Sequence, residues 1–162
     1  MEFQLIKTTP KSVYSTLENI IAPLICGKYE LLRTPNGKPY IEGSPLHFSI
    51  THSGNIAFIA TANVPVGVDF ELIRERNITA TLNRFTVREK NYIANRLEKF
   101  YENWVAKEAF IKMLGQTLAT HLKRLEYFDG KLYSDGIRQY VSIRHISGGI
   151  CAVCLKHSEE KL

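Results

Sequence analysis

Two acidic residues stand at the end of an apolar, β-branched stretch, in Val66-Gly67-Val68-Asp69-Phe70-Glu71. The run over residues 55–70 is typical of strands, with a break at Pro65. Because residues two apart on a strand share a face, Asp69 and Glu71 present their carboxylates side by side, with Cα atoms roughly 7 Å apart. A hard divalent cation, Mg²⁺ or Mn²⁺, relieves the repulsion between them. The ordinary alternative is a solvated acidic turn, so a metal site needs a third carboxylate and a phosphate site elsewhere.

A second group of reactive side chains lies in Trp104-Val105-Ala106-Lys107-Glu108-Ala109-Phe110-Ile111-Lys112. Trp104, Glu108 and Lys112 are four residues apart, which places them on one face of a helix. Taken alone, the Glu–Lys pair is an ordinary surface ion pair worth about 0.3–0.5 kcal/mol. The residues around it are apolar on nearly every side, and charges there are costly unless they line a cleft. We therefore expect Glu108 to join the two strand carboxylates on one cation, with Lys112 on phosphate oxygens.

A histidine follows the apolar segment over residues 46–50, in Thr51-His52-Ser53-Gly54. A histidine in such a hydroxyl-rich turn is well placed to donate to a phosphate, with help from backbone N–H groups. The competing interpretation is a solvated loop histidine. Nucleophilic catalysis by Ser53 or Ser49 is disfavoured, because neither serine is in a Gly-x-Ser-x-Gly turn and His52, adjacent in sequence, is poorly placed to serve as base.

The elements that position these groups follow from the spacing of apolar residues. We expect helices over residues 11–25, from residue 86, and over about 98–114, and strands over residues 29–33, 46–50, 125–128, 131–133, 140–146 and 150–155. Ser12 is the expected cap of the first helix, Thr86-Val87-Arg88-Glu89 is a capping box for the second, and Gly115 ends the third. Arg74-Glu75-Arg76-Asn77 is the expected link between two halves of the chain.

Composition narrows the class of protein. The 162 residues are 44% hydrophobic and 23% charged, which is typical of a globular chain. We expect no membrane span, because no stretch of about 18 apolar residues occurs, and no signal peptide. The net charge of +5 suits an acidic partner, but without a basic run or binding motif we expect no nucleic acid partner.

The chain has three cysteines, Cys26, Cys151 and Cys154, and this odd number favours a reducing, cytoplasmic location. At Cys151-x-x-Cys154, buried thiols are favoured over a zinc knuckle.

Four motifs in order, together covering roughly residues 28–120, carry a family resemblance. They are Gly37-Lys38-Pro39, Phe48-Ser49-Ile50-Thr51-His52-Ser53-Gly54, Val66-Gly67-Val68-Asp69-Phe70-Glu71 and Trp104-Val105-Ala106-Lys107-Glu108-Ala109-Phe110-Ile111-Lys112. This set resembles the 4′-phosphopantetheinyl transferase superfamily, of the surfactin-synthetase-activating type. The resemblance implies an α+β fold of two pseudo-repeated halves, residues 1–76 and 77–162, each with helices packed on a small antiparallel sheet and together forming one compact catalytic unit.

By position, the resemblance also implies the metal ligands and the groups that move protons. Asp69 and Glu108 match metal ligands, and Glu71 matches a third acidic position that binds the metal directly or through water. Glu108 matches the general base, and Lys107 aligns with a lysine assigned a role in proton transfer. The implied cofactor is Mg²⁺, with Mn²⁺ as the substitute.

The remaining matches concern coenzyme A, the implied substrate. His52 matches the histidine on the pyrophosphate, and Lys112 matches the lysine on the phosphate at the bond that breaks. Lys38 and Thr51 match positions that line the adenine nucleotide pocket. The group that binds the 3′-phosphate stays open, because the N-terminal half is expected to be shortened. The run Gly115-Gln116-Thr117-Leu118 also departs from the Gly-Lys-Gly-Leu of the family.

The implied activity is that of a holo-[acyl-carrier-protein] synthase, a Mg²⁺-dependent transferase. The 4′-phosphopantetheine arm of coenzyme A moves to a serine of an apo acyl or peptidyl carrier protein, which is acidic, and adenosine 3′,5′-bisphosphate leaves. Two alternatives stay open: a degenerate module that binds coenzyme A or a carrier without turnover, and another Mg²⁺-dependent phosphoryl-transfer or hydrolytic enzyme. The oligomeric state, monomer or homodimer, also stays open.

Overall fold

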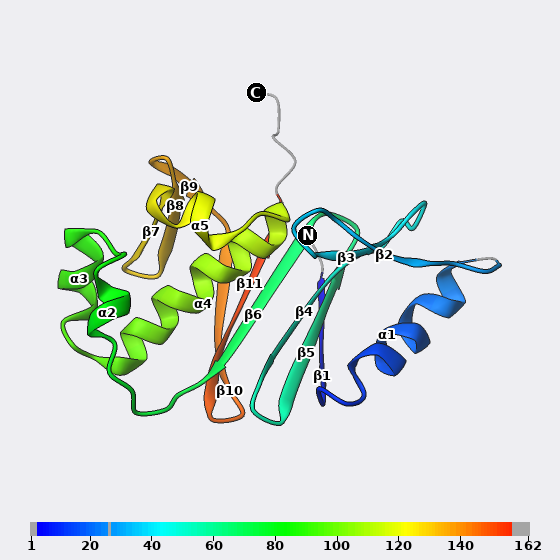
Figure 1. The fold of residues 1–162 in the computed structure, drawn as a ribbon, viewed down its shortest axis with the longest axis horizontal. Coiled ribbons are helices and arrows are strands. Elements are labelled where there is room, and N and C mark those ends of the chain that lie inside the picture. Colours follow the sequence, from blue (N-terminus) through cyan, green and yellow to red (C-terminus); the bar gives the residue numbers. More distant parts are fainter. Residues whose placement is uncertain (1–2, 26, 157–162) are drawn as a thin grey trace.

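The computed structural model describes residues 3–25 and 27–156, and these form an α+β fold, as predicted (Figure 1). The helices are α1 (Val13–Ile21), α2 (Thr79–Leu82), α3 (Val87–Ile93), α4 (Leu97–Leu114) and α5 (Leu118–His121). The strands are β1 (Phe3–Thr8), β2 (Leu31–Arg33), β3 (Pro39–Ile41), β4 (His47–Ser53), β5 (Ile56–Ala62), β6 (Val66–Leu72), β7 (Leu125–Phe128), β8 (Lys131–Ser134), β9 (Ile137–Gln139), β10 (Val141–Ile146) and β11 (Gly149–Leu155). Among the described residues, none of the helices combines the length and hydropathy that crossing a bilayer requires.

Two antiparallel three-stranded sheets form the centre of the molecule. One has the strand order β1-β5-β4 and the other β10-β11-β6. Strand β6 comes from the first half of the chain, yet it pairs along its whole length with β11, from Val66↔Leu155 to Leu72↔Gly149. The expected boundary at residues 76 and 77 lies in coil between β6 and α2. That the halves repeat one unit stays a prediction.

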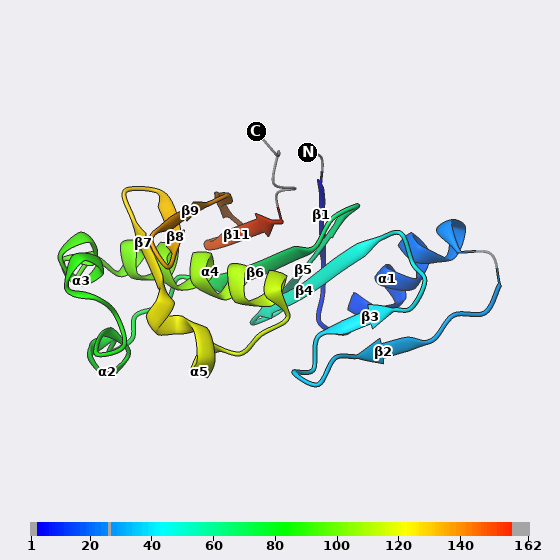
Figure 2. The same ribbon diagram turned by 90° about the horizontal axis from the view of Figure 1, so that it is seen from above.

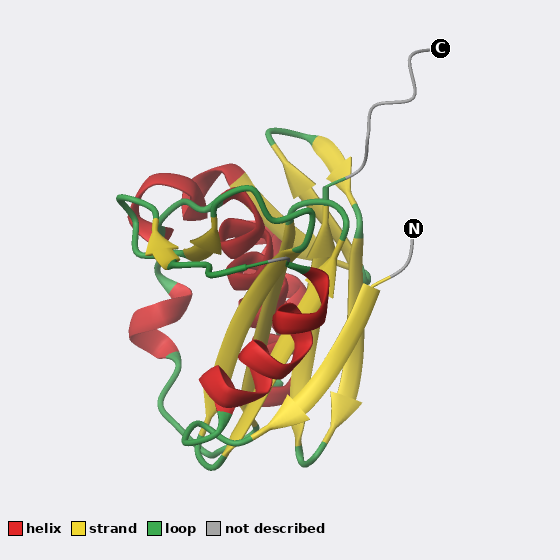
Figure 3. Ribbon diagram, turned by 90° about the vertical axis from the view of Figure 1, so that its right-hand side faces the viewer, coloured by secondary structure: helices red, strands yellow, loops and turns green. Residues whose placement is uncertain are grey.

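The sheets and helices form layers (Figure 2). Helix α1 covers the outer face of the first sheet through Val13, Leu17 and Ile21, as the side view shows (Figure 3). A second apolar cluster, which includes Phe58 and Phe70, lies between the two sheets. A third, the largest, lies between β11 and α4 and extends to α3 and β7. Because residues alternate along β6, Phe70 enters the cluster between the sheets while Asp69 and Glu71 point to the side of α4.

The packing of α4 on β6 depends on a glycine. A Cβ atom added to Gly67 would overlap the carbonyl oxygen of Ala109 and the backbone nitrogen of Met113. Both are backbone atoms of α4, so a side chain at this position forces the helix away from the strand. Helix α4 itself ends at Gly115, which has φ +66° and caps the helix with bonds to the carbonyls of Ile111 and Lys112.

Most expected elements are confirmed, and several details differ. The capping box of α3 forms in both directions. Ser12 stands at the cap of α1, but its side chain makes no capping hydrogen bond. The turn expected at residues 51–54 is wrong for its first three residues: β4 pairs with β5 as far as Ser53↔Ile56, so only Gly54 and Asn55 form the turn. Strands β1, β3 and β9 and helices α2 and α5 have no counterpart among the predicted elements.

The close approach at Gly67 predicts a large cost for a single methyl group. We expect Gly67→Ala to lower the free energy of unfolding by about 2–3 kcal/mol, because overpacking displaces α4. Urea denaturation followed by circular dichroism measures the change. Gly136→Ala is the control, because a carbon added there has nothing within 4 Å. The only expected cost is about 1 kcal/mol for holding an alanine in the left-handed conformation, at φ +79°. An equal effect of the two variants would contradict the close packing.

Candidate functional site

Strands β4 and β6 and helix α4 enclose one pocket, of about 380 Å³. The lining residues are Ile50, Thr51, His52, Asp69, Glu71, Trp104, Glu108 and Lys112. The predicted same-face spacing on α4 is therefore borne out, because Trp104, Glu108 and Lys112 all reach this pocket from successive turns. The strand carboxylates reach it from the opposite wall. Sequence segments far apart thus bring three carboxylates, a lysine and a histidine together.

Asp69 is the most buried acidic group of the pocket, with 5% of its surface exposed. Its Oδ1 atom accepts hydrogen bonds from the Thr51 hydroxyl at 3.0 Å and from the Lys112 ammonium at 2.6 Å. Its Oδ2 atom is buried and has no hydrogen-bond partner among the described residues. A buried carboxylate oxygen without a partner is costly, so this atom is suited to a cation that enters the pocket.

Glu71 lies one step further along β6 and is half-buried. The Ser53 hydroxyl donates to its Oε2 atom at 2.8 Å. Burial raises the pKa of Glu71, and the hydrogen bond from Ser53 opposes that rise. The nearby negative charge of Asp69 raises the pKa further, while Lys112 and Arg76 lower it. The strand pair is therefore a site where negative charge is concentrated and only partly balanced.

Glu108 faces this pair from the helix. Burial, followed by the negative charge of Asp69, raises its pKa to about 7; Lys112 opposes the shift and Glu71 adds to it. A carboxyl group with a pKa near neutrality can accept and release a proton at physiological pH, which is the property that general acid–base catalysis requires.

These residues fit a hard divalent cation. The pocket offers three carboxylates and the orphaned Oδ2 atom of Asp69, and oxygen donors are what Mg²⁺ and Mn²⁺ prefer. The donor atoms of Asp69, Glu71 and Glu108 are not gathered into a closed set, because Lys112 is paired with Asp69 and Ser53 with Glu71. In the part of the chain that the structure describes, three donors lie within 4.8 Å of one another only in a different group, Glu98, Glu102 and His145.

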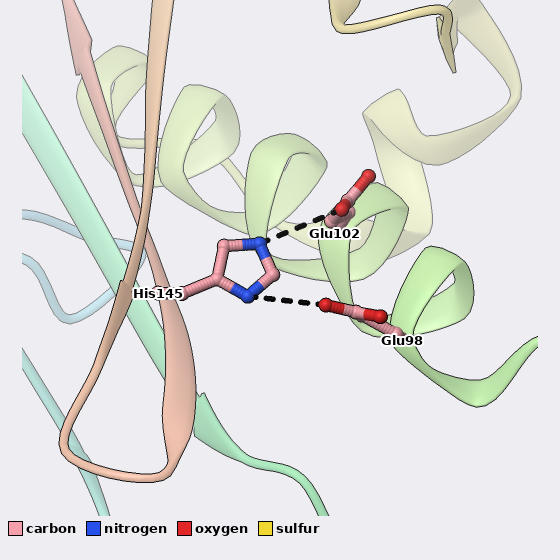
Figure 4. A group of neighbouring side chains, drawn as sticks. All are labelled: Glu98, Glu102 and His145. Carbon is pink, nitrogen blue, oxygen red and sulfur yellow. Dashed lines mark ion pairs between the residues drawn. The ribbon is translucent and has the colours of Figure 1, made fainter.

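That second group fastens strand β10 to the first turns of α4 (Figure 4). The His145 ring places Nδ1 3.2 Å from Glu98 and Nε2 3.6 Å from Glu102. Lys99 already donates to both carboxylate oxygens of Glu102, each at 2.8 Å, and Tyr92 adds a bond of 3.2 Å. Because both carboxylate oxygens of Glu102 already have partners, we interpret the group as an ion-pair network. It lies outside the pocket of Asp69.

Two residues predicted to contact coenzyme A, His52 and Thr51, differ in how available their side chains are. His52 is exposed at the pocket and free to meet a ligand. The Thr51 hydroxyl is buried and already used: it accepts from the Phe70 N–H at 3.1 Å and donates to Asp69. Thr51 therefore lines the pocket as a support for the acidic pair.

Lys38 lines a neighbouring pocket of about 240 Å³, which shares Ile50 and Lys112 with the first. Its ammonium donates to the carbonyl oxygens of Val66 at 3.0 Å and Met113 at 3.2 Å. Burial lowers the pKa of Lys38 to about 8. Lys38 thus joins the start of β6 to the end of α4 and forms a wall of the smaller pocket.

Lys107 does not line the pocket of Asp69. It is 1% exposed and forms an ion pair of 2.5 Å with Glu89 of α3, which is completely buried. Glu89 also accepts from the Asn103 side chain at 3.1 Å and from the Tyr127 N–H at 2.9 Å. Because adjacent helix residues differ by about 100° around the axis, Lys107 faces the core where Glu108 faces the pocket. The geometry makes Lys107 a core contact of α4, away from any proton transfer in the pocket.

The cysteine motif behaves as the favoured interpretation predicts. Cys151 belongs to the cluster between the sheets and Cys154 to the cluster under α4, so their sulfur atoms lie on opposite faces of β11. Two thiols on opposite faces cannot share a zinc ion. Burial raises the pKa of both thiols, that of Cys151 to about 12. Cys26 lies outside the described residues.

Sequence reasoning missed two residues that support the site, Ser53 and Glu89. The alternation Ser49-x-Thr51-x-Ser53 is a usable signal for Ser53, because it places three hydroxyls on one face of a strand. The capping box marks Glu89 as a helix-start residue but gives no sign of its buried partner Lys107.

The pKa of Glu108 predicts how its neutral analogue changes stability with pH. The folded state holds the Glu108 proton more tightly than the unfolded state, so wild-type stability falls as pH rises from about 4.5 through 7. Glu108→Gln removes this loss, and we expect its melting temperature to exceed the wild-type value by about 2–4 °C at pH 8 and by much less at pH 5. Calorimetry in metal-free buffer measures the difference. Glu42→Gln, exposed and outside the pocket, is the control, and a gain that is the same at both pH values would contradict the assignment.

The buried ion pair predicts a second stability effect. We expect Glu89→Gln to lower the free energy of unfolding by about 3–5 kcal/mol, because it leaves the Lys107 ammonium buried without a counter-charge. The double variant Glu89→Leu/Lys107→Met, which removes both charges, should lose less stability than Glu89→Gln. Arg124→Met, which breaks the exposed pair with Asp135, should have a far smaller effect in the same urea titration. A small effect of Glu89→Gln would show that the pair is not buried as described.

Comparison with known proteins places this pocket in a family. A sequence profile of the 4′-phosphopantetheinyl transferase superfamily matches residues 65–147. A 4′-phosphopantetheinyl transferase of Bacillus subtilis is 33% identical over 106 residues, 62% of this chain and 46% of the relative. The 4′-phosphopantetheinyl transferase gsp of Aneurinibacillus migulanus is 29% identical over 122 residues, 65% of this chain and 51% of the relative.

An animal protein gives the same result: the L-aminoadipate-semialdehyde dehydrogenase-phosphopantetheinyl transferase of Xenopus laevis is 34% identical over 117 residues, 60% of this chain and 39% of the relative. The chain spans about half the length of the curated relatives it matches, or somewhat less. The matched segment contains Asp69, Glu71, Glu108 and Lys112, the acidic pocket described above. The chain belongs to the 4′-phosphopantetheinyl transferase superfamily.

Proposed function

We propose that this chain transfers the 4′-phosphopantetheine arm of coenzyme A to a serine of an apo carrier protein, with Mg²⁺ as cofactor. The observation that carries the proposal is the pocket in which Asp69, Glu71 and Glu108 face one another beside Lys112, with one Asp69 oxygen left without a partner. Membership of the superfamily supports the class of reaction.

Asp69, Glu71 and Glu108 would hold the Mg²⁺ ion, which supplies charge neutralisation at the pyrophosphate of coenzyme A. His52, exposed at the rim, is placed to donate to the same pyrophosphate. Lys112 is held by Asp69 and lies between the two pockets, so its ammonium is available to a phosphate oxygen once Asp69 has another counter-charge. These groups position and neutralise the phosphates, which is where most catalysis of phosphoryl transfer originates.

The chemical step exchanges one phosphorus–oxygen bond for another. The hydroxyl oxygen of the carrier serine bonds to the β-phosphorus, and the bond from that phosphorus to the bridging oxygen breaks. Adenosine 3′,5′-bisphosphate leaves with the bonding electrons. Glu108 takes the serine proton, directly or through water. The neighbouring pocket beside Lys38 is the proposed place for part of the nucleotide. The net charge of +5 suits an acidic carrier surface.

A transfer assay tests the proposal. Purified protein, fluorescent coenzyme A and a panel of apo acyl and peptidyl carrier proteins should give labelled carrier in the presence of Mg²⁺ and none with a chelator. Asp69→Ala and Glu108→Ala should each lower the rate by about 10³-fold, because each removes an acidic ligand of the phosphate-neutralising cation. Glu42→Ala, exposed and outside the pocket, should keep the wild-type rate.

Each alternative has its own result in this assay. Calorimetric binding of coenzyme A without any labelled carrier indicates a binding module. Release of adenosine 3′,5′-bisphosphate without an acceptor indicates a hydrolytic enzyme. Full transfer by folded Asp69→Ala or Glu108→Ala would overturn the proposed site.

A further inference from the structure

Strands β4 and β6 lie side by side but belong to different sheets (Figure 1). Serine and threonine side chains of β4 connect them. The N–H groups of Val68, Phe70 and Leu72 donate to the hydroxyls of Ser49, Thr51 and Ser53, at 3.1, 3.1 and 3.2 Å. Every pair is 19 residues apart in sequence, so the two strands run parallel and in constant register. Hydroxyl side chains thus replace the backbone carbonyls that a regular sheet would use at this join.

The direction of these hydrogen bonds is fixed by chemistry. A backbone N–H can only donate, so each hydroxyl oxygen acts as the acceptor and its own proton must point elsewhere. The Ser53 proton is directed to Oε2 of Glu71 at 2.8 Å, as the Thr51 proton is directed to Asp69. For Ser49 no carboxylate partner is described. One chain of bonds therefore runs from the Leu72 backbone through Ser53 to a carboxylate of the acidic pocket.

We propose that Ser53 is a positioning residue that holds the Glu71 carboxylate toward the cation shared with Asp69 and Glu108. This inference rests on the proposed metal site and adds a residue that acts on it through Glu71. Glu71 is half-buried near the end of β6 and has three rotatable side-chain bonds, so without an anchor its carboxylate can turn to solvent. Hydrogen-bond partners of metal-ligating carboxylates orient them, and their loss typically lowers metal affinity 10–100-fold.

Ser49 provides a matched control. Its hydroxyl makes the same bond to the backbone of β6, two residues before Thr51 on the same strand, and no hydrogen bond from it to the acidic pair is described. Loss of the Ser49 hydroxyl therefore disturbs the join between the strands without touching a carboxylate. Ser53→Thr is the conservative variant, because Thr51 shows that a threonine fits this series of bonds.

The dissociation constant of Mn²⁺, measured by electron paramagnetic resonance of the free ion, tests the inference without any substrate. We expect Ser53→Ala to raise it about tenfold, with Ser49→Ala within twofold and Ser53→Thr within about threefold of wild type. Melting temperatures should fall in both alanine variants, since Ser49→Ala loses one bond to β6 and Ser53→Ala loses two. A second measurement uses Glu71→Gln: if Ser53 acts through Glu71, adding Ser53→Ala to this variant changes Mn²⁺ binding little further.

The outcomes separate two failures. If wild-type protein does not bind Mn²⁺ at millimolar concentration, the proposed metal site fails, and the role of Ser53 fails with it. If the wild type binds Mn²⁺ but Ser53→Ala and Ser49→Ala change the constant equally, or if Ser53→Ala and Glu71→Gln act additively, the inference about Ser53 is overturned and the metal site stands.

Discussion

The contact between β6 and α4 is the constraint on which the acidic pocket depends. Gly67 lets the strand meet the backbone of the helix at Ala109 and Met113, and no residue with a side chain could do so without displacing one of them. This approach sets how far the strand carboxylates stand from the helix carboxylate. Lys38 reinforces the contact at its far end, where its ammonium bonds to one carbonyl from each element. The position of Glu108 opposite Asp69 therefore follows from packing that involves neither residue.

The rotation of helix α4 about its own axis must also be fixed, and a buried ion pair fixes it. The ion pair between Lys107 and Glu89 ties the helix to α3, and the bond from the Tyr127 backbone ties Glu89 to β7. A buried pair of this kind contributes little net stability over an apolar pair, but either partner alone is costly. It therefore selects one orientation of the helix. That orientation puts Lys107 in the core and its neighbour Glu108 in the pocket.

Much of this arrangement could be predicted from residue spacing. Alternation along β6 placed Asp69 and Glu71 on one face, and four-residue spacing placed Glu108 and Lys112 on another, and both faces line the same pocket. The rest depends on tertiary contacts that periodicity does not encode. A lysine in an apolar helix does not reveal whether it faces a cleft or a buried glutamate, so Lys107 could not be placed. Lys38 bonds to carbonyls that are distant in sequence, and the end of β4 was set by its pairing with β5.

The pairing of β6 with β11 has a consequence for how the protein is made. Strand β6 and the strands of the first sheet leave the ribosome long before β11, which is the last strand of the described chain. Until β11 emerges, the edge of β6 that pairs with it has open backbone groups. The nascent chain can thus assemble its N-terminal sheet early, but β6 gains its partner strand in the second sheet only after β11 has emerged.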